Sequence, residues 1–181
     1  FVQQSGLERL REPIRLALRA GASVRLLTGD YLNITQAQAM ETLLDWQVAS
    51  ELPEEQDEEV AGALEARVIE TRLLPKGVAS FHPKSWRFEG PGFGIAFVGS
   101  SNISHAALRN GIEWNLRVDR DRDADAYRAI KEGFETLWGQ ATRLTDAWVR
   151  DYAARARERP EPLPPAELTH QEVQPLPEPH D

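Results

Sequence analysis

Several features are missing from this 181-residue chain, and each absence removes a class of protein. The chain has no cysteine, so it has neither a disulfide framework nor a thiolate metal site, as expected in a reducing cytoplasm. No apolar run approaches the ~20 residues of a membrane span, and no signal peptide is visible. We therefore expect a cytoplasmic protein, without a membrane partner, that buries one sizeable core.

A positive net charge is also missing. The formal net charge is −8, whereas strong nucleic-acid binders usually show a basic face. The acidic residues are concentrated in two segments, so that residues 51–59 carry −6 and residues 159–181 carry −4. The rest of the chain is left with +2, a balance that neither excludes DNA nor argues for it. We expect residues 51–59 to form a solvated loop.

The chain divides into an α/β domain over residues 1–158 and a Pro/Glu-rich linker or disordered tail over residues 159–181. Seven of the twelve prolines lie in that tail, which argues against a packed core there. Residues 5–20 show helical periodicity, and a glycine and an apolar strand in residues 23–28 follow. A helix followed by a strand across a short turn is typical of an α/β fold. We expect a largely continuous mixed sheet with helices on both faces. Further helices are expected at residues 35–49, 123–137 and 145–157, and strands at residues 64–70, 85–89, 94–98 and 112–118.

Two polar stretches carry the candidate chemistry. His82 and Lys84 flank Pro83, which favours an extended backbone in which residues two apart point to the same side. The turn of residues 99–102, Gly-Ser-Ser-Asn, follows an apolar strand and offers N–H groups, hydroxyls and an amide to an anion. Imidazole, ammonium, hydroxyl and amide together make a phosphate site that needs no metal or cofactor.

The strand expected at residues 112–118 alternates, so Glu113 and Asn115 point towards this polar site and the apolar residues point away from it. Asp30, after the first strand, is expected to cap a turn rather than bind a ligand. His105 is expected on the surface of a short helix. We expect three tryptophans to lie in the core rather than to stack on bases: Trp46, Trp86 and Trp114.

The polar residues occur in a fixed order, namely His82-x-Lys84, then the acidic Glu89, then Gly-Ser-x-Asn at residues 99–102. This order resembles the active-site motif of the phospholipase D superfamily. Glu113 resembles the acidic residue that supports the histidine in the smaller nucleases of that superfamily. Glu89 stands where the motif usually has Asp, and the interval from Glu89 to residue 99 is longer than usual. That acidic position is generally structural in the superfamily.

The surrounding residues 24–31, 34–35 and 113–115 are more specifically similar to the nuclease-type domain found fused to bacterial superfamily 2 (DEAD/DEAH-type) helicases. The resemblance covers about residues 1–140. It implies a phospholipase D-like fold present as a single half-domain and a DNA partner. Because the chain begins with Phe1 and not Met, we also expect a longer protein, with an ATP-binding helicase domain after the proline-rich tail.

The same resemblance implies a hydrolase, namely a metal-independent nuclease that acts through a phosphohistidine. His82 would be the nucleophile, and Lys84 and Asn102, with Ser100 or Ser101, would bind the non-bridging oxygens. Glu113 would fix the tautomer of His82. The leaving group needs a second histidine as acid, and no other histidine has a lysine two residues later. The resemblance therefore implies a homodimer that completes the site.

Two other classes of function remain open at this point. One is a non-catalytic DNA-binding or dimerisation module of a helicase, with the site present but little used. The other is a lipid phosphodiesterase, which is the least favoured because no amphipathic membrane helix or basic patch is evident. Cleavage of a generic phosphodiester without divalent ions separates the nuclease from the binding module.

Overall fold

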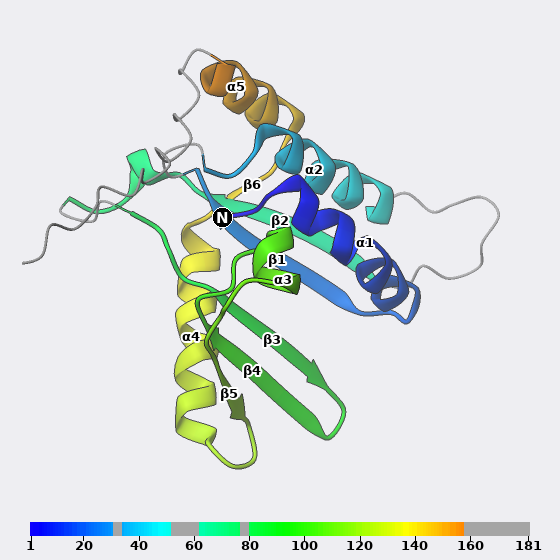
Figure 1. Ribbon diagram of the computed structural model, residues 1–181, viewed down its shortest axis with the longest axis vertical. Coiled ribbons are helices and arrows are strands. Elements are labelled where there is room, and N and C mark those ends of the chain that lie inside the picture. Colours follow the sequence, from blue (N-terminus) through cyan, green and yellow to red (C-terminus); the bar gives the residue numbers. More distant parts are fainter. Residues whose placement is uncertain (31–33, 52–61, 77–79, 158–181) are drawn as a thin grey trace, which may run out of the picture.

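The computed structural model describes residues 1–30, 34–51, 62–76 and 80–157, and it shows a mixed α/β domain (Figure 1). Most of the acidic segment and the tail from residue 159 lie outside the described residues. The α-helices are α1 (Gln4–Arg19), α2 (Ala37–Glu51), α3 (His105–Arg109), α4 (Ala124–Gln140) and α5 (Asp146–Arg157). The strands are β1 (Ser23–Gly29), β2 (Ala63–Ile69), β3 (Ser85–Gly90), β4 (Phe93–Gly99), β5 (Asn115–Asp119) and β6 (Thr142–Arg143), with a 3-10 turn, η2 (Thr71–Leu73), after β2.

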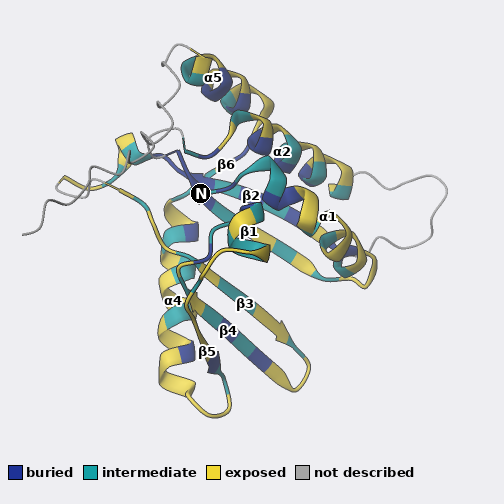
Figure 2. Ribbon diagram, viewed as in Figure 1, coloured by how far each residue is buried: buried dark blue, intermediate teal, exposed yellow. Residues whose placement is uncertain are grey.

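The first sheet has the order β1-β2-β6, with β1 parallel to β2 and β6 antiparallel to β2. Alternate side chains of β1 and β2, among them Leu26 and Ala66, point towards α1 and α2 and form the main core. α5 packs beside α2, and its buried Tyr152 donates a hydrogen bond of 2.7 Å to the carbonyl of Thr35. Figure 2 shows the buried residues gathered between this sheet and these helices.

The second sheet has the order β3-β4-β5 and is antiparallel throughout. Its small core consists of Ala96 and Val118, which are paired across the strands and pack against Tyr127 and Ile130 of α4. α4 is the helix that covers this sheet, and it covers one face (Figure 1).

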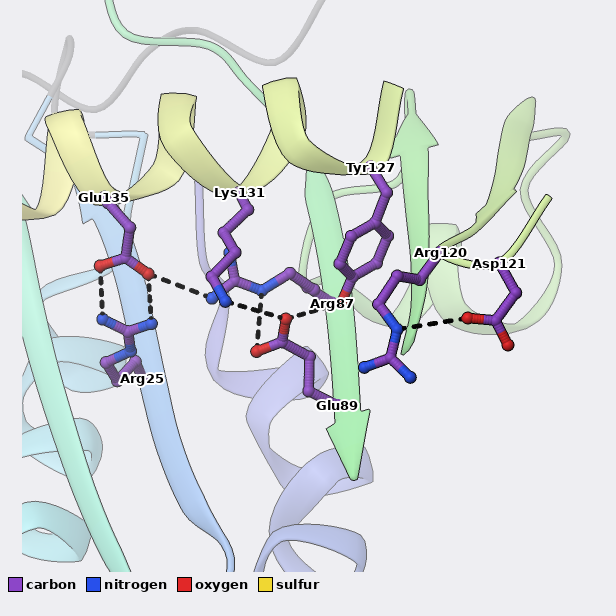
Figure 3. A network of polar contacts seen from close by, with 8 residues as sticks. All are labelled: Arg25, Arg87, Glu89, Arg120, Asp121, Tyr127, Lys131 and Glu135. Atoms are coloured by element: carbon purple, nitrogen blue, oxygen red, sulfur yellow. Dashed lines mark hydrogen bonds and ion pairs between the residues drawn. The ribbon is translucent and has the colours of Figure 1, made fainter. Parts of the chain in front are cut away.

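α4 also holds the two sheets together through a polar network (Figure 3). Arg25 of β1 donates hydrogen bonds of 2.6 and 2.8 Å to the carboxylate of Glu135, and Arg87 of β3 donates to the same carboxylate at 3.2 Å. The hydrogen bonds from Arg25 are the main reason that the pKa of Glu135 falls to about 2. Tyr127 donates to Glu89 of β3 at 2.9 Å, and burial together with this contact raises the pKa of Tyr127 to about 12.

The expectation of a largely continuous sheet is wrong, because β3 pairs with β4 and not with β1 or β2. Side-chain alternation shows where strands lie but not which strands pair, and strands that follow each other in sequence pair most easily. Helices do cover both faces of the first sheet, with α1 and α2 on one side and α4 on the other, whereas the second sheet has α4 on one side. The coarser α/β assignment is correct.

Candidate functional site

The site begins in the extended segment that leads into β3. The Nζ atom of Lys84 lies 2.6 Å from Nδ1 of His82, and the same ammonium donates to the carbonyl of His82 at 3.0 Å. The carbonyl of Lys84 accepts from the N–H of Gly99 at 3.1 Å, which extends the β3–β4 ladder by one residue. Pairing with β4 thus holds the extended backbone that brings the imidazole and the ammonium together.

The charge of Lys84 controls the protonation of the imidazole. It is the main cause that lowers the pKa of His82, with a smaller contribution from burial, so the ring is neutral at neutral pH. Burial also lowers the pKa of Lys84, although the carboxylate of Glu113 acts in the opposite direction. Because Nδ1 accepts from Lys84, the neutral ring carries its proton on Nε2 in this arrangement.

The turn at residues 99–102 lies against the segment before β5 because residue 99 is glycine. A Cβ atom there would lie 2.0 Å from the carbonyl oxygen of Trp114, which no side chain tolerates. The N–H of Ser100 donates to that carbonyl at 3.0 Å, and the N–H of Trp114 donates to Oγ of Ser100 at 3.1 Å. Ser100 also donates to the carboxylate of Glu113, so the turn and the acidic residue are joined directly.

Asn102 reaches the site from the other side. Its Oδ1 accepts from the backbone nitrogen of Phe1 at 3.2 Å, and the ring of Phe1 lies 6.3 Å from the ring of His82. Val2 forms a parallel bridge with Ile103, which fixes the N-terminal segment beside the turn. Asn102 and His82 are therefore both neighbours of Phe1.

The structure places the expected site residues at one end of the β3–β4–β5 sheet, but their contacts differ from the expected roles. Among the described residues, the carboxylate of Glu113 accepts from Ser100 and not from His82. Ser101 is buried, and its hydroxyl accepts from Asn115 at 2.7 Å, so it supports the turn. The candidate anion-binding side chains are thus His82, Lys84, Ser100 and Asn102.

Four sequence expectations outside this group can be checked. Asp30 accepts from the N–H and the hydroxyl of Thr71 at 2.7 and 2.9 Å, so it caps a turn as predicted. Glu89 binds Tyr127 in the network between the sheets, which is a structural position. The expected strand 112–118 is wrong at its start, because β5 begins at Asn115. Trp46 packs against the core as expected, whereas Trp86 is half-buried outside both core clusters and Trp114 is 83 % exposed.

A shallow hollow beside His82 adds residues that sequence reasoning missed. Phe1, Ile34 and Phe81 line it together with Gly29, the last residue of β1. The sequence signal was available for Phe81, which directly precedes His82, and for residue 29, which ends a strand where α/β folds place ligands. Only the fold could bring Phe1 and Ile34 to the same place.

The described residues contain no group of three or more His, Asp or Glu side chains placed to hold a metal ion. None of the helices in the described ranges is both long enough and apolar enough to cross a membrane. Comparison of the chain with models of known protein families finds no match, and no curated protein matches it either. Function must therefore be argued from the site.

Proposed function

We propose that this chain is a metal-independent phosphodiesterase of the phospholipase D type, with DNA as its substrate. The observation that carries the proposal is the pairing of His82 with Lys84, at 2.6 Å, on the sheet end that also holds Ser100, Asn102 and Glu113. An imidazole with a lowered pKa is available as a nucleophile at neutral pH. The ammonium beside it is a ready partner for a phosphate oxygen.

In the proposed reaction a ring nitrogen of His82 attacks phosphorus, and the bond from phosphorus to the leaving oxygen breaks. The leaving oxygen takes a proton from a second histidine, which enters this step as an imidazolium because the bound phosphate anion favours the charged form of that ring. That histidine then accepts a proton from water, whose oxygen attacks phosphorus as the phosphorus–nitrogen bond breaks. Lys84, Ser100 and Asn102 would stabilise the charge on the non-bridging oxygens. The Lys84–His82 contact would open when the phosphate enters between them.

The second histidine would come from a second copy of the chain, because His82 is the only histidine in the sequence that is followed by a lysine two residues later. An isologous dimer would bring two copies of the site face to face. Sedimentation at micromolar concentration should therefore show a dimer. Mixing His82→Ala chains with Lys84→Ala chains should restore little activity, because each shared site would lack one half. An active strict monomer would contradict this assembly.

The test of the activity is hydrolysis of bis(4-nitrophenyl) phosphate and of plasmid DNA in the presence of EDTA. The unmodified chain should cleave both, and His82→Ala should lower the rate by at least roughly 10³-fold, since the nucleophile and the general acid are both removed. His105→Ala is the matched control, because it removes a histidine of α3 and should leave the rate unchanged. Complete loss in EDTA, restored by Mg²⁺, would contradict the proposal.

One contact favours a second candidate function. The carboxylate of Glu113 is engaged by Ser100, so it does not orient the imidazole of His82 as a nucleophile requires. A non-catalytic DNA-binding or dimerisation module would need no such orientation. DNA binding that depends on Lys84, without hydrolysis of either substrate, would support this alternative.

The wider context belongs to the same proposal and follows from the resemblance. We place the domain in a longer cytoplasmic protein with an ATP-dependent helicase part. The reading frame that contains these residues tests this directly, because helicase motifs should follow the proline-rich segment.

A further inference from the structure

The face of the β3–β4–β5 sheet that points away from α4 carries a row of aromatic side chains. Arg87, Ala96 and Val118 pair across the sheet and point towards α4. Since side chains alternate along a strand, the intervening positions occupy the other face. We call this set the aromatic face: Trp86, Phe88, Phe93, Ile95, Phe97 and Arg117.

The rings on the aromatic face lie against the sheet with one side open. Phe88 and Phe97 form an edge-to-face pair with ring centroids 6.5 Å apart. The ring of Phe93 lies over Gly90, its partner on β3. The contact is so close that a Cβ atom added at Gly90 would lie 2.2 Å from the ring. Phe88 is 50 % exposed and Phe93 is 45 % exposed. Over these three strands Figure 1 shows α4 as the covering helix, and α4 lies on the opposite side.

The aromatic face is continuous with the candidate phosphate site. Lys84 precedes Trp86 by two positions in the extended ladder, so both side chains point to the same side of the sheet. His82 precedes Lys84 by two more. From Lys84 to the end of β3 the strand extends for about 20 Å at 3.3 Å per residue. A strand of a few nucleotides with its phosphate at Lys84 would therefore lie over the rings.

We propose that the aromatic face stacks on the unpaired bases of single-stranded nucleic acid whose backbone reaches His82 and Lys84. The inference rests on the proposed function and adds the substrate class. Aromatic rings on an open sheet bind bases without sequence preference, because every base has a π-face. In a duplex these base faces are already stacked on their neighbours, so duplex DNA gains nothing from the rings.

The size of the face favours this occupant over a second protein chain. Three strands about 4.8 Å apart and about 20 Å long present roughly 300 Å². A stable protein interface needs about 800 Å² from each partner and has few charges at its centre. Arg117 and its ion-pair partner Asp119, 2.7 Å away, lie on this face. The small area of the face fits a short flexible strand better than a second copy.

The experiment measures the binding of a labelled oligothymidylate by fluorescence anisotropy. Phe88→Ala should weaken binding about tenfold, the usual loss for one stacking ring, whereas Phe88→Trp should retain it. Phe88→Thr serves as a second ringless variant that keeps a strand-forming side chain, in case the alanine variant does not fold. Leu16→Ala is the matched control, since Leu16 is 54 % exposed on α1, away from this face. Duplex affinity should not change in any variant.

Hydrolysis of bis(4-nitrophenyl) phosphate separates this inference from the proposed function, because that small diester, bound at Lys84, is too short to reach Phe88, which lies four residues or about 13 Å farther along the strand. Phe88→Ala should leave its rate unchanged. If the diester is not hydrolysed at all but oligothymidylate binding still depends on Phe88, the nuclease fails and the aromatic face stands. Oligothymidylate affinity that is unchanged in both ringless variants overturns the inference. So does a shift of these variants from dimer to monomer with unchanged affinity, which would assign the face to a second copy.

Discussion

The β1–β2–β6 sheet is packed on both faces, whereas the β3–β4–β5 sheet is packed on one. Thirteen buried residues form the core of the first, against three in the second, within the residues that the structure describes. Yet the candidate site residues lie at the end of the second sheet, with β1 contributing the floor of the hollow at Gly29. The buried core that stabilises the fold and the candidate site therefore lie in different parts of one domain.

The difference teaches how an exposed site can be held in place. A small core of Ala96, Val118 and Tyr127 cannot hold three strands rigidly by burial alone. The network of Arg25, Arg87 and Glu135 anchors the second sheet to the first through α4. The site therefore depends on the large core at a distance.

The largest expected loss of stability comes from a cavity in the main core, and it tests whether the two sheets differ in packing. Leu43 of α2 is fully buried there, so Leu43→Ala should reduce the free energy of unfolding by roughly 2–5 kcal/mol. Val118→Ala, the matched change in the second sheet, should cost only about 1 kcal/mol, since it removes less volume from a smaller core. Urea unfolding measures both values, and equal losses would refute the division between the sheets.

A smaller effect is expected where the site itself is packed. Gly99→Ala places a methyl group within 2.0 Å of the carbonyl oxygen of Trp114, so the segment before β5 must move. We expect a loss of about 1–3 kcal/mol in the free energy of unfolding, together with loss of the Ser100–Glu113 contact. Gly133→Ala on α4 meets no atom within 4 Å and is the control. Chemical shifts of the backbone near Ser100 that stay unchanged in Gly99→Ala would contradict the close approach.

The connection between the sheets should be sensitive to acid. Glu135 has a pKa lowered to about 2 mainly by Arg25, so its stabilisation is present above about pH 4.5 and is lost as the pH falls towards 2. The side chain is 41 % exposed, so screening by solvent limits the contribution to about 1 kcal/mol. Glu135→Gln should remove this amount at pH 7 and only a small part of it at pH 2, where the carboxyl is about half protonated. Glu132→Gln, on the same helix, is the control for an exposed charge, and an equal loss in both variants would contradict the role of the network.

The smallest effect concerns the protonation of His82. Lys84→Met removes the charge that lowers the pKa of His82, so that pKa should rise towards its ordinary value near 6.5. Titration of the imidazole by NMR measures the change directly and does not depend on activity. Lys131→Met removes an ammonium from the network on α4 and should leave His82 unaffected. A pKa that does not move in Lys84→Met would place the two side chains apart in solution.

Much of this fold was predictable from local patterns. Helices α1, α2, α4 and α5 lie within a few residues of their predicted positions, because their apolar periodicity and end signals are local properties. The pairing of His82 with Lys84 was also predictable, since alternation in an extended segment needs only neighbouring residues. The same reasoning was wrong for Trp114, because alternation identifies a face but not whether anything covers it.

The sequence by itself determined the positions of the four longest helices and of most strands, together with the polar residues at two strand ends, because these follow from spacing along one chain. The tertiary structure decided that the strands form two sheets, that Glu113 binds Ser100 and not His82, and that Phe1 lies next to both His82 and Asn102. Within the described ranges, it also left the aromatic face without a covering helix. The physical reason is that contacts between residues far apart in sequence depend on how the whole chain packs, so local sequence patterns do not predict them.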